Sequence, residues 1–142
     1  MSQDNVEAWR ASIEELRAAT SEVDREAWLA STSEFWDQDI ELDVSEVPGM
    51  GMSGIYLGRE AVQELWRDWF RGWEALSYDY QLVEAGERVV MLMEWSPRKR
   101  RSGAEPPVLK NALVSTFKNG LMVHSKFYMS HGEALEAAGL SE

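Results

Sequence analysis

Hydrophobic residues between positions 56 and 73 recur at the spacing of an α-helix, and polar residues fill the positions between them. The apolar positions follow the series i, i+3, i+4, i+7, i+8 and i+11, which places on one face Val62, Leu65, Trp66, Trp69, Phe70 and Trp73. Charged and amide side chains occupy the opposite face. Each tryptophan ring buries roughly 150–250 Å². We therefore expect this helix to pack against a broad partner, such as a sheet.

Two shorter helices and a strand are predicted before this stretch. Apolar spacing predicts a first helix over residues 5–19, and Asp24 is the expected N-cap of a second helix over residues 25–32. Ile40, Leu42 and Val44 alternate with acidic residues, which is typical of a half-exposed strand. In the glycine-rich loop over residues 47–54, Met50 and Met52 either cover a pocket mouth or have no ligand role.

The second half of the chain has the pattern of strands and turns. Strands are predicted over residues 77–85, 88–96, 108–117 and 121–129. Asn119-Gly120 between two alternating runs is a strong hairpin signal. Ser130 and Glu133 form a capping box that opens a last short helix, which ends at Gly139. Helices followed by an antiparallel meander indicate an α+β fold.

The composition is that of a globular protein. The chain has 142 residues, of which 44% are hydrophobic, and we expect one domain over residues 1–142. No window approaches the roughly 18 consecutive apolar residues of a membrane span, and residues 1–10 lack the layout of a signal peptide. These features predict a cytoplasmic protein without a membrane partner. The absence of cysteine excludes disulfides and thiolate metal sites.

The charge of the chain argues against a nucleic-acid partner. Its formal net charge is −11, whereas binding to phosphates requires a basic face. The basic run over residues 98–101 lies between Pro97 and Gly103, in a predicted loop. Its position favours a solvated hairpin tip over an anion site.

Several motifs, together with the order of the elements, resemble a known family. They are YLGREAV at 56–62, GERVV at 86–90, SG at 102–103, TFKNG at 116–120 and EALEAAGL at 133–140. In these the chain resembles the SnoaL-like branch of the nuclear transport factor 2-like (NTF2-like) superfamily, which includes polyketide cyclases and ketosteroid isomerases. The resemblance implies a cone-shaped α+β barrel in which N-terminal helices pack on a strongly bent antiparallel sheet. It also implies one cavity and a homodimer formed through the outer sheet face.

Alternation along the strands predicts which side chains line this cavity. Because an unpaired buried lysine is costly, we place Lys126 outside with Met122, His124 and Tyr128, and Val123 inside. The predicted lining suits a flat or hydrophobic small molecule. It comprises Trp36, Trp66, Trp69, Met91, Met93, Trp95, Asn111, Leu113, Ser115, Ser125 and Phe127.

The candidates for catalysis are few. In the cyclases of the resembled family a carboxylate on the last strand shuttles a proton, but Phe127 stands at the matching position here. The remaining candidates are Asp39, Asp43, Tyr56 and His124. Each has a structural alternative: strand-edge charges for the aspartates, helix-entry packing for Tyr56, and the sheet surface or a dimer interface for His124. Two histidines so placed predict no metal site, and no cofactor motif is present.

Three functional hypotheses follow from the sequence. The resemblance favours a cofactor-free acid–base isomerase, cyclase or hydrolase that acts on a hydrophobic carbonyl compound and requires a carboxylate or histidine inside the cavity. The alternative is a non-catalytic binding or accessory protein for a hydrophobic ligand. A pure interaction module would instead use Met122, His124 and Tyr128 on the sheet surface.

Overall fold

A computed structural model describes residues 2–46 and 52–140 of the chain. Its helices are α1 (Ser2–Ala18), α2 (Glu22–Thr32), α3 (Arg59–Gly72) and α4 (His131–Ala137), with a 3₁₀ turn at Ser33–Phe35. Its strands are β1 (Trp36–Asp43), β2 (Ile55–Leu57), β3 (Trp73–Ala85), β4 (Arg88–Lys99), β5 (Ala112–Lys118) and β6 (Leu121–Tyr128).

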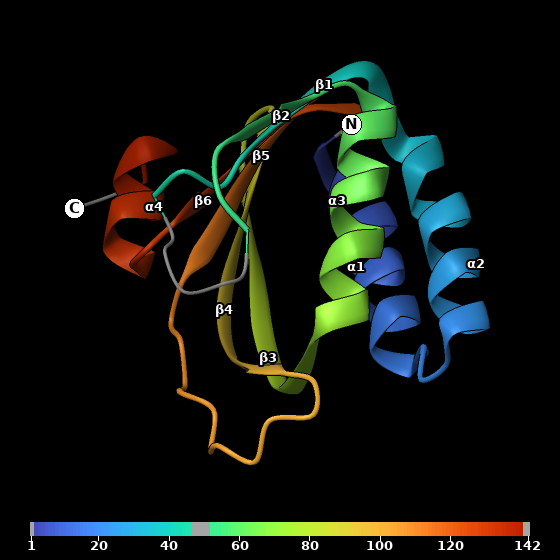
Figure 1. Cartoon of the computed structure of the whole chain (residues 1–142). Coiled ribbons are helices and arrows are strands. Elements are labelled where there is room, and N and C mark those ends of the chain that lie inside the picture. The colour runs from blue at the N-terminus through green and yellow to red at the C-terminus, as the bar shows by residue number, and fades with distance from the viewer. Residues whose placement is uncertain (1, 47–51, 141–142) are drawn as a thin grey trace.

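The strands form one strongly curved sheet in the order β2-β1-β6-β5-β4-β3. All neighbouring pairs are antiparallel except β1 and β6, which run parallel. The sheet is therefore mixed, where the sequence predicted it to be purely antiparallel. Helices α1, α2 and α3 lie on one side of it and α4 on the other (Figure 1). The predicted α+β cone is confirmed.

The long aromatic helix is shorter than its hydrophobic pattern suggested. Its first predicted residues form β2, and Trp73 begins β3. Gly58 separates strand from helix because it adopts a φ of +93°, which side chains other than glycine rarely tolerate, and its N–H donates to the carbonyl of Ile40 at 2.7 Å. Arg59 then donates to the carbonyl of Trp36 at 2.6 Å. These bonds fix the start of α3 against β1.

The predicted helix caps are right at one helix and wrong at another. Ser130 caps α4 by accepting a hydrogen bond from the N–H of Glu133 at 3.1 Å, as the capping box predicted. The N-cap of α2 is Ser21, whose hydroxyl accepts from the N–H of Asp24 at 3.1 Å. Serine and aspartate are both favoured caps, so the local sequence did not distinguish them.

A bulge between β5 and β6 overturns two predicted assignments, Met122 outside and Val123 inside. Thr116 pairs with His124, but Phe117 pairs with Met122, so Val123 is the extra residue of the bulge. Met122 is therefore buried in the inner core, where alternation had placed Val123. The assignment of Ser125 and Phe127 to the inner face is unaffected.

The sheet separates two apolar clusters. The inner one lies between the sheet and α1, α2 and α3, and it contains Met52 from the predicted glycine-rich loop, whereas Met50 lies outside the described residues. The outer one joins Val90, Ala112 and Val114 to α4. Within residues 2–46 and 52–140, no helix has the length and apolar composition needed to cross a membrane.

Candidate functional site

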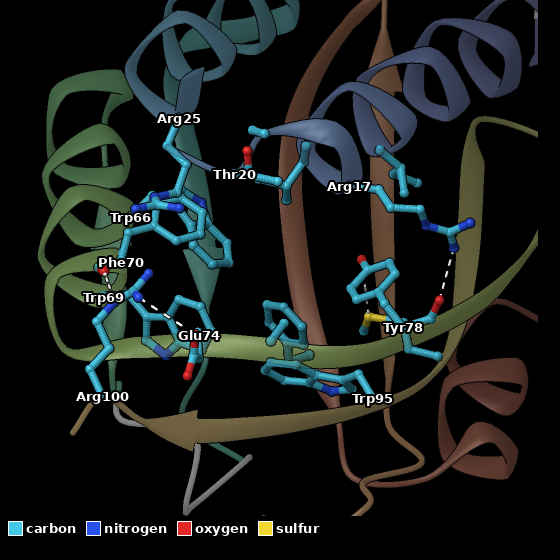
Figure 2. Close-up of a pocket in the computed structure, with 16 residues that line it drawn as sticks. Arg17, Thr20, Arg25, Trp66, Trp69, Phe70, Glu74, Tyr78, Trp95 and Arg100 are labelled. Atoms are coloured by element: carbon cyan, nitrogen blue, oxygen red, sulfur yellow. Dashed lines mark hydrogen bonds and ion pairs between the residues drawn. The ribbon is translucent and has the colours of Figure 1, made fainter. Parts of the chain in front are cut away.

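A cavity of about 590 Å³ lies among α1, α2, α3 and the inner face of the sheet (Figure 2). Aromatic rings from four different elements form much of its wall: Trp66, Trp69 and Phe70 from α3, Tyr78 from β3, Trp95 from β4, and Phe127 from β6. A volume of this size falls within the roughly 300–1,000 Å³ typical of small-molecule sites. The wall offers a flat ligand stacking partners on several sides.

A second, smaller cavity of about 120 Å³ adjoins the first. Both are lined by Ile13, Leu16, Trp66, Tyr78, Met93 and Phe127, which form the boundary between them. The smaller cavity continues along the inner face to Trp36, Met91, Leu113 and Ser125. A bound molecule could therefore extend beyond the larger chamber if the shared side chains change rotamer.

The position of Trp69 explains how α3 supports the wall. Its ring stacks on Trp73 with a centroid distance of 6.3 Å and an interplanar angle of 11°, and it approaches Trp95 across the cavity wall at 5.9 Å. Phe70 packs edge-on at 5.6 Å. Such aromatic pairs add stability beyond the burial of their area. The cluster holds α3 at a fixed distance from β4.

Tyr78 places a neutral hydroxyl at the boundary of the two chambers. The hydroxyl lies 3.9 Å from the sulfur of Met91 and 4.0 Å from that of Met93, and a thioether is only a weak acceptor. Burial raises the pKa of Tyr78, so its oxygen keeps the proton at neutral pH. The hydroxyl can therefore donate to an oxygen of a ligand.

Glu74 is held by two arginines at one side of the larger cavity. Arg98 approaches its Oε1 at 2.5 Å, and Arg100 approaches its Oε2 at 3.6 Å. The hydrogen bond from Arg98 is the main cause that holds the pKa of Glu74 below its ordinary value, against the opposing effect of burial. Arg100 also donates from Nε to the carbonyl of Phe70 at 2.8 Å. The basic run is thus no simple solvated hairpin tip, because two of its arginines fold onto β3.

The predicted catalytic residues lie away from both cavities. Asp39 is exposed on β1, and His124 lies 3.4 Å from Glu41 and is 41% exposed. Asp43 is buried, but the N–H and hydroxyl of Ser45 donate to its carboxylate at 2.9 and 2.6 Å. Tyr56 on β2 packs at the margin of the inner core. None of the four lines either cavity. Asp39 and Asp43 alternate on β1 with Ile40 and Leu42, which line the smaller cavity, so the two aspartates point to the opposite face of the sheet. Tyr56 lies on β2, the edge strand.

Most of the predicted lining does face the cavities. The larger cavity is lined by Trp66, Trp69, Met93, Trp95 and Phe127. The smaller cavity shares Trp66, Met93 and Phe127 with it and is also lined by Trp36, Met91, Leu113 and Ser125. Two predicted residues line neither chamber. Asn111 accepts a hydrogen bond from the indole N–H of Trp95 at 2.8 Å, and Ser115 is bonded to Ser125 at 2.7 Å. Their polar atoms are satisfied within the core.

The sequence reasoning missed the polar lining of the larger cavity, namely Arg17, Thr20, Arg25, Glu74, Tyr78 and Arg100. Tyr78 had a usable signal, because Tyr78, Tyr80 and Leu82 alternate on one face of a predicted strand. The charged lining residues had no such signal, because a local sequence pattern does not distinguish a charged side chain that lines a cavity from one in solvent. Across the described parts of the chain, no group of three or more His, Cys, Asp or Glu side chains could hold a metal ion.

We expect Asp43 to stabilise the fold and to do so in a pH-dependent way. Burial alone would raise the pKa of Asp43, but the bonds from Ser45 and the charge of Lys126 outweigh it and leave the pKa below its ordinary value. A depressed pKa in the folded state stabilises above the unfolded value, and this contribution is lost as pH falls through the folded value. Asp43→Asn should lower the free energy of unfolding by about 1 kcal/mol at neutral pH, and by less under acidic conditions.

Urea unfolding at several pH values measures this difference. Asp39→Asn is the matched control, because Asp39 is exposed on the same strand. It should leave stability unchanged within about 0.5 kcal/mol. A loss for Asp43→Asn that does not vary with pH would contradict the assigned role.

Comparisons with solved structures identify the fold. An NTF2-like protein of unknown function from Burkholderia pseudomallei matches with a TM-score of 0.69 at 21% identity, covering 93% of this chain and 95% of its own. A Mesorhizobium loti protein that carries the name SnoaL-like polyketide cyclase matches with a TM-score of 0.64 at 18% identity over 87% and 97%. TerC, co-crystallised with polyporic acid, matches with a TM-score of 0.64 at 19% identity over 95% and 98%. No protein-family model and no curated protein sequence matches the chain.

Proposed function

We propose that this chain, which has the NTF2-like fold of SnoaL-like proteins, binds a flat hydrophobic small molecule in its aromatic cavity without acid–base catalysis there. The observation that carries the proposal is the cavity of about 590 Å³ with its aromatic walls. Burial of a planar ligand between such rings is favourable in proportion to its apolar area. The TerC structure with polyporic acid, a neighbour of the same fold, supports small-molecule binding.

The charges near the cavity weigh against the alternative, an acid–base isomerase or cyclase. A general base works best when its pKa lies near the working pH and when it reaches the proton it removes. Asp39, Asp43 and His124 line neither cavity. Among the described residues, Glu74 is the one carboxylate that lines the larger chamber, and Arg98 holds its pKa low. A carboxylate stabilised in its charged form is a poor proton acceptor from carbon.

Tyr78 gives the proposed site one point of polar recognition. Its phenol stays protonated and faces two methionine sulfurs, so a carbonyl or hydroxyl oxygen of the ligand would be a stronger acceptor than its present neighbours. This favours an oxygen-bearing aromatic compound over a pure hydrocarbon. Homodimerisation, a cytoplasmic location and a single domain over residues 1–142 remain predictions from the sequence.

Binding and catalysis can be separated with one pair of probes. Phenylnaphthylamine, whose fluorescence rises in apolar surroundings, should bind, and acetonaphthone should compete with it. In deuterated water, NMR should then show no faster exchange of the protons next to the acetonaphthone carbonyl than buffer alone produces. We expect this because the Glu74 carboxylate is engaged by Arg98 and Arg100.

The contrary result would identify an enzyme. Exchange that the protein accelerates and that Glu74→Gln abolishes would show that Glu74 acts as a base. Glu64→Gln is the matched control, because Glu64 is exposed on α3 and pairs with Arg67 outside the cavity. Failure of phenylnaphthylamine to bind at all would contradict the binding function itself.

A further inference from the structure

Positive charge gathers at the larger cavity of a protein that is acidic overall. The net charge of the chain is −11, yet the charged side chains described along this cavity are Arg17, Arg25 and Arg100 against Glu74. Figure 2 shows Arg25 above the rings of Trp66 and Phe70, Glu74 and Arg100 below them, and Arg17 apart from these three beside Tyr78. The charged residues that line the cavity therefore carry a net positive charge, opposite to the net charge of the whole molecule, and this favours entry of anions.

The charges of Glu74 and Arg17 are already matched within the protein. Arg98 donates to Glu74 from both Nε and Nη2, at 3.1 and 2.5 Å, and Arg98 itself does not line the cavity. Arg17 lies 3.7 Å from Glu14 and donates to the carbonyl of Tyr78 at 2.9 Å. These pairings leave Arg25, and Arg100 with its longer contact of 3.6 Å to Glu74, as the excess positive charge along the cavity.

Arg25 has the more available guanidinium of the two. Its Cζ lies 5.7 Å from the centre of the Phe70 ring, and within the described residues no carboxylate approaches it within the 4.0 Å of an ion pair. Arg100 stands on the other side of Phe70, whose carbonyl it contacts, and is only 3.6 Å from Glu74. A planar guanidinium with free donors beside an aromatic wall fits a carboxylate or sulfonate attached to an aromatic ring.

We propose that the natural occupant of the cavity is an aromatic acid, whose ring system lies between the tryptophans and whose anionic group binds at Arg25 with support from Arg100. The inference rests on the proposed function, that the cavity holds a small molecule, and adds the charge of that molecule. Hydrophobic contact supplies affinity for any flat ligand, whereas the arginines discriminate in favour of the anion.

Two fluorescent dyes that differ by one sulfonate test this proposal. Anilinonaphthalene sulfonate is the anion, and phenylnaphthylamine is its neutral counterpart. Arg25→Gln should weaken binding of the sulfonate about tenfold, the scale of one charge-assisted contact at a partly exposed site, while binding of the neutral dye changes less than about twofold. Arg25→Lys keeps the charge and should retain most of the sulfonate affinity.

Arg71→Gln is the matched control, because Arg71 lies on α3, pairs with Asp68 at 2.7 Å and is 67% exposed outside the cavity. It should change the binding of neither dye. A salt titration of the unaltered protein makes the same test without a substitution. Added salt should weaken the binding of the sulfonate dye and leave the binding of the neutral dye unchanged.

The outcomes separate the two proposals. If both dyes bind but Arg25→Gln and salt affect them equally or not at all, the inference about charge is wrong and the binding function stands. If neither dye binds, the binding function fails and the inference fails with it. If the Arg25→Gln variant binds neither dye, the salt titration of the unaltered protein tests the inference instead. A sulfonate affinity that does not depend on salt would then overturn it.

Discussion

Replacing Trp69 by alanine is expected to lower the free energy of unfolding by about 3–5 kcal/mol, the range for removing a large buried aromatic side chain. Trp69 is only 5% exposed, and its ring touches Trp66, Phe70, Trp73 and Trp95. Removal would forfeit its buried apolar area and open a void that these rings fill only in part. Urea or thermal unfolding would measure the loss.

Val108→Ala provides the comparison, because Val108 is 64% exposed and its truncation should cost less than about 0.5 kcal/mol. A loss below about 1 kcal/mol for Trp69→Ala would mean that the wall collapses freely around the missing ring. In that case α3 would not hold the cavity open. If Trp69 supports the cavity wall, weaker binding of phenylnaphthylamine should accompany the loss of stability.

Replacing Asn111 by leucine is expected to cost about 1–3 kcal/mol, because it leaves the buried indole N–H of Trp95 without its acceptor. Asn111 is 4% exposed and Trp95 is 5% exposed, and the bond between them measures 2.8 Å. Both residues are buried, so the N–H has no ready substitute acceptor. The substitution should also loosen the orientation of Trp95 in the cavity wall.

A double-mutant cycle isolates this bond from the other contacts of Asn111. Trp95→Phe removes the donor, so Asn111→Leu should cost at least about 1 kcal/mol less in that background than in the unaltered protein. Additive losses would show that the indole bond is not what stabilises Asn111. Equilibrium unfolding of the four proteins provides the required free energies.

The fold could be predicted from the sequence because its main signals are local. Helical spacing from Val62 to Trp69, alternation in β4 and the Asn119-Gly120 turn each depend on a few neighbouring residues. The same alternation correctly placed Met91, Met93 and Trp95 on the inner face. The one error on β6 came from a bulge, which inserts a residue without a clear local signal.

The site was harder to predict because its chemistry depends on contacts between distant segments. Glu74 and Arg98 meet across the pairing of β3 and β4, where Glu74 is the direct partner of Arg98. Arg25 reaches the cavity from α2, and its place over Phe70 depends on how α2 packs against α3. Conversely, Asp39 and Asp43 had suitable side chains, but they alternate on β1 with Ile40 and Leu42, which line the smaller cavity, and therefore point to the other face of the sheet.

By itself the sequence determined the apolar wall, because the periodicity of tryptophan, methionine and phenylalanine along α3, β4 and β6 decides which of them turn away from water. Only the tertiary structure decided which charges border the chamber. A charged side chain carries no periodic signal of its own, and whether it borders a cavity, pairs with another charge or stays in solvent depends on the packing of elements far apart in the chain. For this protein that packing placed arginines, and no free carboxylate among the described residues, beside the aromatic cavity.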